Sequence, residues 1–120
     1  MPSRRRLAYV RPKVEKDDNG KNIITYEGID NSHKWNRLKT YGAKLVENIT
    51  QGVARDLLLY AMQNMQDMEI VGHVHDEVII ECTPDVSVEQ VCELMGQTPE
   101  WAEGLLLRAD GYECAFYMKQ

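Results

Sequence analysis

A long apolar stripe in the middle of the chain constrains the fold more than any other feature. Beyond residue 42 the apolar side chains recur at four-residue spacing, at Leu45, Ile49, Val53, Leu57 and Ala61. This is the period of an amphipathic α-helix, which we predict over residues 42–67. A helix of roughly 25 residues is about 37 Å long, enough to cross an ordinary domain, so we expect its apolar face to pack on a sheet.

Short β-prone runs before and after this helix predict two hairpins. Asn19-Gly20 joins two such runs within residues 1–28, and Asn-Gly between β-prone segments is a strong hairpin signal. A second hairpin is predicted over residues 70–82. Residues 29–40 are polar, and we interpret them as an ordered surface loop anchored by Trp35.

The C-terminal part predicts one more helix and one more strand. Ser87 is well placed to cap a helix over 86–95, which Gly96 ends. Residues 105–118 are mostly β-prone and predict a terminal strand. The order of elements predicts an α+β fold, in which an antiparallel β-sheet packs against one long and one shorter α-helix within a single domain over 1–120.

Charge is divided unevenly along the chain. The net charge is −5, but residues 1–44 carry 11 Lys and Arg against 5 Asp and Glu, whereas residues 45–120 carry 3 against 14. The acidic total argues against a protein that coats nucleic acid, while the division is typical of a polyanionic partner or of cation binding. No apolar run approaches the ~18 residues of a membrane span, so we expect a cytoplasmic protein without a membrane partner.

The densest chemistry lies at the turn of the second predicted hairpin, in His73-Val74-His75-Asp76-Glu77. Two adjacent carboxylates repel each other, and a bound cation would relieve that repulsion. The residues allow three interpretations. The turn could simply be solvated, His73, His75 and Asp76 could seat zinc in a small metal-dependent hydrolase, or Asp76 could be an oxygen ligand for Mg²⁺. Spacing alone does not separate these interpretations.

Val74-His75-Asp76-Glu77, with its apolar flanks, resembles motif C of the family A DNA polymerases. The similarity is wider than four residues. Residues 45–56 resemble the long palm helix that precedes motif C in phage-type members, and residues 2–9 resemble the segment by which the chain returns from the fingers to the palm. Residues 107–113 resemble the closing strand of prophage members. The resemblance therefore covers nearly the whole chain, in order.

The resemblance implies that the chain is the C-terminal part of a polymerase palm. The implied reaction is a two-metal nucleotidyl transfer that uses Mg²⁺, with Mn²⁺ as a substitute, and has primer-template DNA and a dNTP as partners. By this match Asp76 is a metal ligand, Glu77 is a weaker ligand beside the metals, and His75 supports the primer terminus.

Candidate DNA contacts lie in the basic part of the chain and on the long helix. Gln51 matches a helix position that contacts duplex DNA in the family. The family often carries Arg and Asn eight and four residues earlier, where this chain has Ala43 and Glu47. Near the N-terminus, further cations could contact DNA phosphates, namely Arg4, Arg5 and Arg6.

Residues 1–44 supply neither the second metal-binding aspartate of motif A nor a fingers helix. We therefore predict weak Mg²⁺ binding and no primer extension by this chain alone. An upstream polymerase polypeptide carrying motif A and the fingers is expected to restore synthesis if the enzyme is split. The alternative to a polymerase fragment is a non-catalytic nucleic-acid-binding or interaction remnant that self-associates through open strand edges.

Overall fold

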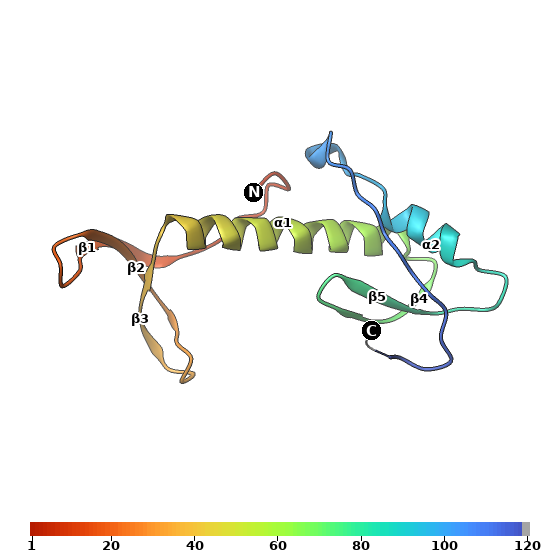
Figure 1. The fold of residues 1–120 in the computed structure, drawn as a ribbon, viewed down its shortest axis with the longest axis horizontal. Helices are drawn as coiled ribbons and strands as arrows, with labels where there is room; N and C mark the ends of the chain where they lie inside the picture. Colours follow the sequence, from red (N-terminus) through yellow and green to blue (C-terminus); the bar gives the residue numbers. More distant parts are fainter. Residues whose placement is uncertain (119–120) are drawn as a thin grey trace. The chain divides into compact units, whose positions relative to one another are not determined.

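The computed structural model describes residues 1–118 (Figure 1). Its elements are, in order, β1 (Val10–Lys16), β2 (Asn22–Ile29), β3 (Trp35–Thr40), α1 (Gly42–Asn64), β4 (Glu69–Val74), β5 (Glu77–Glu81), α2 (Val88–Met95) and a short 3-10 helix (Glu100–Ala102). Two antiparallel sheets and two α-helices within these residues confirm the α+β class. The boundary between two compact units of the chain falls inside α1, between Gly52 and Val53.

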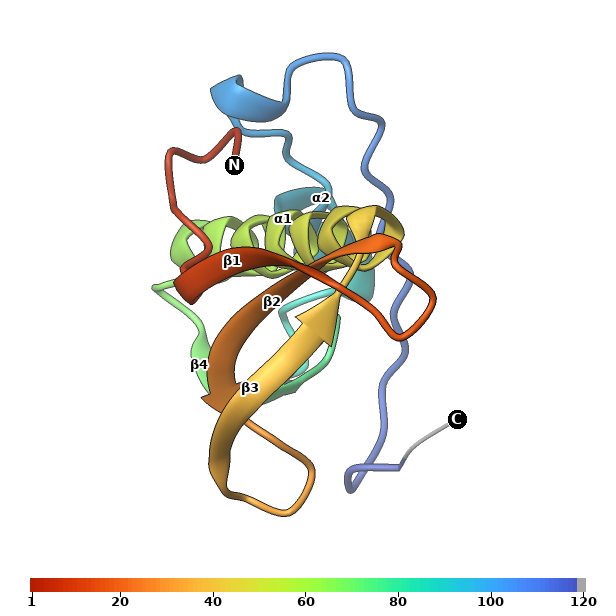
Figure 2. The same cartoon turned by 90° about the vertical axis from the view of Figure 1, so that its left-hand side faces the viewer.

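The first unit contains a three-stranded sheet with β2 between β1 and β3 (Figure 2). The predicted Asn19-Gly20 turn joins β1 to β2, and Gly20 adopts φ +74°, which favours glycine. The Asp17 carboxylate accepts hydrogen bonds from the backbone N–H groups of Asn19 (2.9 Å) and Lys21 (2.8 Å). The first hairpin is therefore confirmed, and its turn is closed by local hydrogen bonds.

The segment interpreted as a loop, residues 29–40, instead supplies the third strand. β3 pairs with β2 from Ile29↔Trp35 to Ile24↔Thr40. Trp35 is the first residue of this strand and is 60% exposed, so it does not anchor a loop. The sequence pattern does not predict this strand, because charged and polar residues occupy both of its faces. They weaken the alternation of apolar and polar residues by which most strands are recognised.

Tyr9 connects β2 to the N-terminal half of α1 within the first unit. Its ring packs edge-on against Tyr26 of β2, with ring centroids 5.1 Å apart. Its hydroxyl accepts a hydrogen bond from Asn48 Nδ2 of α1 at 3.0 Å. A single aromatic side chain thus holds sheet and helix together through one apolar and one polar contact.

The long helix forms as predicted but ends three residues earlier, at Asn64. The chain tightens after that point, since the amides of Met65 and Gln66 donate to carbonyls three residues back. In the second unit the buried apolar side chains belong to this end of the helix and the turn after it. They are Leu58, Ala61 and Met65.

The second predicted hairpin and the second predicted helix are both confirmed. β4 and β5 pair antiparallel from Glu69↔Glu81 to Val74↔Glu77, with an irregularity between Ile70 and Gly72. Ser87 caps α2, and the capping box with Gln90 is complete. None of the helices that the structure describes combines the length and the apolar composition needed to cross a membrane.

Residues 105–118 form no strand, although their composition predicts one. The segment instead runs along α2 in extended form (Figure 1). A Cβ atom on Gly111 would lie only 3.0 Å from Val88 Cγ1, which shows how closely the segment approaches the helix. A strand needs a neighbour that completes its backbone hydrogen bonds, and the described residues offer this segment none.

Candidate functional site

The acidic motif lies at the tip of the β4–β5 hairpin. Val74 and Glu77 are paired, so His75 and Asp76 form a two-residue turn between the strands. His75 adopts φ +53°. A positive φ is required at the first central residue of the tight turns that join such strands, and His tolerates it better than most non-glycine residues. The hairpin thereby presents Asp76 at a defined, exposed position.

The two carboxylates of the motif have different surroundings. Asp76 is exposed, and nothing within residues 1–118 is hydrogen-bonded to its side chain. Glu77 accepts a hydrogen bond from the Tyr117 hydroxyl at 3.4 Å. Burial raises the pKa of the Tyr117 phenol, and the charge of Glu77 raises that pKa further. Glu77 therefore has a hydrogen-bond donor beside it, whereas Asp76 is open to a ligand.

The chemistry of these donors fits a hard cation, but only in part. Mg²⁺ is bound by proteins through one or two carboxylates, and water and substrate phosphates complete its coordination. Asp76 and Glu77 can supply such oxygens. In the part of the chain that the structure describes, no group of three His, Cys, Asp or Glu side chains is placed to hold a metal. These residues would therefore supply a partial ligand set.

The alternative zinc ligands, His73, His75 and Asp76, are not placed to hold a metal together within the described residues. The Arg55 guanidinium lies 3.2 Å from His73 Nδ1. Because arginine can only donate, Nδ1 must accept, and the ring carries its proton on Nε2. A neighbouring cation and a protonated Nε2 both disfavour metal binding at His73, so the hydrolase interpretation lacks its ligands.

Two of the predicted DNA-contact positions lie close together in the first unit. Arg5 Nη2 donates to the Gly52 carbonyl oxygen at 3.2 Å, directly after Gln51 on α1. A Cβ on Gly52 would come within 2.6 Å of Met1 Sδ, so the N-terminal segment lies against this turn of the helix. Arg4 is exposed and adopts φ +65°. Arg5 and the Gln51 turn of α1 thus lie side by side, as a shared DNA contact would require.

Gln51 itself is engaged with a neighbour on α1. Its Nε2 donates to Glu47 Oε1 at 3.3 Å, and Lys44 Nζ lies 2.9 Å from the same carboxylate. The acidic residue that replaces the family's asparagine is therefore paired with a cation one turn earlier. This pairing reduces the repulsion that Glu47 would exert on a phosphate.

Sequence reasoning missed two side chains around the motif, Tyr117 and Arg55. They lie 40 and 18 residues from their partners, and no local pattern connects them. Only the folded chain brings them to the hairpin.

Comparison with known proteins finds a phage relative. The chain is 45% identical over 123 residues to the protein named "DNA polymerase" of Bacillus phage SP02, and the match covers 99% of this chain and 19% of the relative. The chain therefore spans about a fifth of the relative's length. No protein-family model and no solved structure matches the chain. The chain is thus similar, along its whole length, to one part of a phage DNA polymerase.

Proposed function

We propose that this chain is the motif C part of the palm of a family A DNA polymerase. Its reaction in the intact enzyme is template-directed nucleotidyl transfer from a dNTP to a primer. One observation carries the proposal: Asp76 and Glu77 stand exposed at a tight hairpin tip, in a chain that is similar throughout to part of a phage DNA polymerase.

The residues of the hairpin fit the needs of phosphoryl transfer, which depends on positioning and electrostatic stabilisation. Asp76 and Glu77 would hold Mg²⁺, which when bound lowers the pKa of the primer 3′-hydroxyl and neutralises phosphate charge. The paired strands keep both carboxylates in place, and the Tyr117 hydroxyl donates a hydrogen bond to Glu77. His75, at the first position of the turn, supports the primer terminus.

The chain alone is proposed to be inactive, because one of the two principal aspartates of such a site is missing. Each missing carboxylate weakens cation binding and removes charge neutralisation. The relative is about five times longer than the matched segment, and the rest of such a protein would supply motif A and the fingers.

Metal binding tests the role of the hairpin directly. Paramagnetic Mn²⁺ added to the chain should broaden the backbone amide signals of residues 74–78, and Asp76→Asn should abolish the broadening. Asp18→Asn is the matched control, since Asp18 is also an exposed aspartate in the turn between two paired strands, β1 and β2. Equal broadening in wild type and Asp76→Asn would contradict the proposed site.

Primer extension tests the reaction. The purified chain with Mg²⁺ should add no nucleotide to a labelled primer. Mixed with the part of the SP02 relative that lies outside the match, it should restore synthesis, and Asp76→Asn in the chain should remove that gain. Synthesis by the chain alone would overturn the proposed inactivity, and no gain on mixing would favour the non-catalytic remnant.

A further inference from the structure

One face of the three-stranded sheet gathers most of that sheet's cations. Residues directly opposite each other in antiparallel strands share a face, and Thr25 of β2 pairs with Lys13 of β1 and with Lys39 of β3. Along β2, Glu27 lies on the same face and pairs with Arg37. We call this the basic face, and its charged and polar residues together with Trp35 are Arg11, Lys13, Glu15, Thr25, Glu27, Trp35, Arg37 and Lys39.

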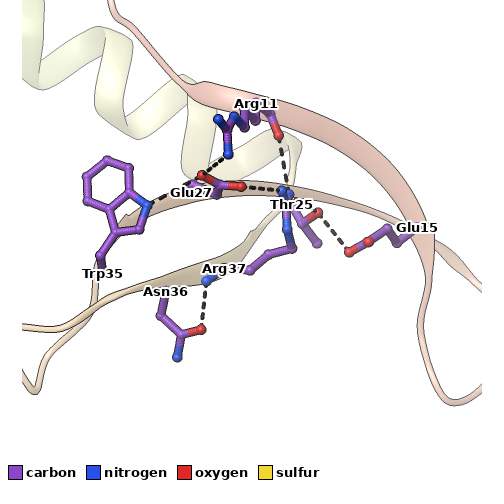
Figure 3. A network of polar contacts seen from close by, with 7 residues as sticks. All are labelled: Arg11, Glu15, Thr25, Glu27, Trp35, Asn36 and Arg37. Carbon is purple, nitrogen blue, oxygen red and sulfur yellow. Dashed lines mark hydrogen bonds and ion pairs between the residues drawn. The ribbon is translucent and has the colours of Figure 1, made fainter.

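Glu27 holds the two arginines of the basic face in fixed positions (Figure 3). Its carboxylate lies 3.1 Å from Arg37 Nη2 and 3.4 Å from Arg11 Nη1. Burial alone would raise the pKa of Glu27, but the hydrogen bond from Trp35 and the two arginine charges together hold the pKa below its usual range. One carboxylate thus organises two guanidinium groups and remains ionised.

The two lysines of the basic face have no such partner. Lys13 and Lys39 are exposed, and no carboxylate within residues 1–118 forms an ion pair with either. They lie on the two outer strands, on either side of Thr25, roughly 10 Å apart at the usual strand spacing. The face therefore carries four cations against two carboxylates, and its unpaired charge is positive.

Trp35 gives the basic face an exposed aromatic surface. Its Nε1 donates to Glu27 Oε2 at 3.4 Å, which fixes one edge of the indole, yet the residue is 60% exposed. Exposed aromatic rings beside cations are the usual means by which proteins bind single-stranded nucleic acid, because any base can stack on the ring.

A strained residue lies at the edge of the same face. β1 uses an extra residue between Val10 and Lys13, and Arg11 there adopts φ +45°. A positive φ is unfavourable for arginine, and such bulges re-aim a side chain. Here the bulge directs the Arg11 side chain to Glu27 and its carbonyl to Arg37 Nη1, at 3.2 Å. The local strain is offset by contacts that complete the basic face.

We propose that the basic face binds single-stranded DNA, with backbone phosphates on Lys13 and Lys39 and a base stacked on Trp35. Charge complementarity selects a polyanion, and the exposed ring selects unpaired bases. The choice of DNA as the polyanion rests on the proposed function. The face is built from residues of the first unit, shares no residue with the acidic hairpin and needs no metal ion.

Fluorescence anisotropy of a labelled oligo-dT, measured on the whole chain in EDTA, tests the lysines. The double variant Lys13→Gln/Lys39→Gln should weaken binding about tenfold and flatten the dependence of log K on log salt by about 1.4, as two lost phosphate contacts require. The control Lys16→Gln/Lys21→Gln removes the same charge, but Lys16 pairs with Asn22 away from this face and Lys21 precedes β2. Equal losses in both double variants would overturn the proposal.

Trp35 separates single-stranded from duplex binding. Trp35→Ala should weaken oligo-dT binding roughly fivefold or more, and Trp35→Phe should restore most of it, because both aromatic rings can stack. A duplex of equal length should be insensitive to either change. Unchanged oligo-dT binding by Trp35→Ala, or equal losses on duplex, would overturn the stacking role.

The same variants distinguish this proposal from the proposed polymerase function. Asp76→Asn should leave oligo-dT binding in EDTA unchanged, and the lysine variants should leave Mn²⁺ broadening at the hairpin unchanged. Loss of oligo-dT binding in Asp76→Asn would contradict a separate DNA-binding face.

Discussion

Two buried threonines on neighbouring strands allow the polar contacts of the sheet to be tested by one kind of substitution. Thr25 and Thr40 are 2% and 5% exposed. The Thr25 hydroxyl donates to Glu15 Oε2 at 2.8 Å and accepts from Arg37 Nη1 at 3.1 Å. The Thr40 hydroxyl is buried without a hydrogen-bond partner within residues 1–118. Valine has nearly the same shape as threonine but no hydroxyl, so substitution isolates the hydrogen bonds.

The expected effects of the two substitutions have opposite signs. Thr25→Val loses two hydrogen bonds to charged groups, but Glu15 and Arg37 can regain water at the surface. We therefore expect a loss of about 1–2 kcal/mol in the free energy of opening the sheet. Thr40→Val removes a hydroxyl that is desolvated without compensation, and should be neutral or stabilise the sheet by up to about 1 kcal/mol.

Native-state hydrogen exchange of the β2 and β3 amides is the suitable assay, because the chain forms two compact units and a global melting curve would average them. Thr25→Val should speed exchange of these amides about 5- to 30-fold, while Thr40→Val should leave it unchanged or slow it. Two results would contradict this reasoning: Thr40→Val destabilises the sheet as much as Thr25→Val, or the amides of Thr25→Val exchange as slowly as those of the wild type. Either result would mean that hydrogen bonding of these hydroxyl groups does not determine the stability of the sheet.

Two further predictions concern a helix cap and a turn. Ser87→Ala removes the hydrogen bond from the Gln90 backbone N–H to the Ser87 hydroxyl, while the Ser87 backbone N–H that donates to Gln90 Oε1 is kept, and should destabilise α2 by about 1 kcal/mol, seen as faster exchange of its amides. The Ser32 hydroxyl and the Lys34 backbone N–H hold the pKa of Asp30 below its usual range, so this turn should be stabilised at neutral pH and lose that contribution as pH falls through the lowered pKa. An NMR titration of the Asp30 carboxyl should show the depressed pKa, and Ser32→Ala should raise it.

Elements that depend on local signals could be predicted from the sequence. The apolar period of α1, the Ser87 cap of α2 and the Asn19-Gly20 turn are each encoded within a few residues, and the structure confirms all three elements. β3 and residues 105–118 show the limit of that reasoning. A polar segment became a strand because β2 offered it hydrogen-bonding partners, whereas a β-prone segment without such a partner stayed irregular.

Some features of the candidate site could likewise be predicted from the sequence, and others could not. The position of Asp76 at a hairpin turn follows from the apolar runs on either side of it, and the structure has the turn there. Tyr117 and Arg55 could not be predicted, because their contacts with Glu77 and His73 depend on tertiary structure. The Arg55 contact disfavours the zinc hypothesis, because it engages His73 Nδ1 and leaves the proton on the other ring nitrogen.

The net charge of −5 illustrates why a whole-chain total is a poor guide to a partner. A protein that transfers nucleotides needs cations where it meets phosphates and carboxylates where it holds metal ions, and these requirements cancel in the sum. Within residues 1–118, Lys13 and Lys39 lie on the basic face without an ion-pair partner, and Asp76 lies at the hairpin tip without a hydrogen-bond partner. Raising the salt concentration should therefore weaken oligo-dT binding and Mn²⁺ binding through opposite charges on separate residues, and each set of variants should reduce only its own binding and salt response.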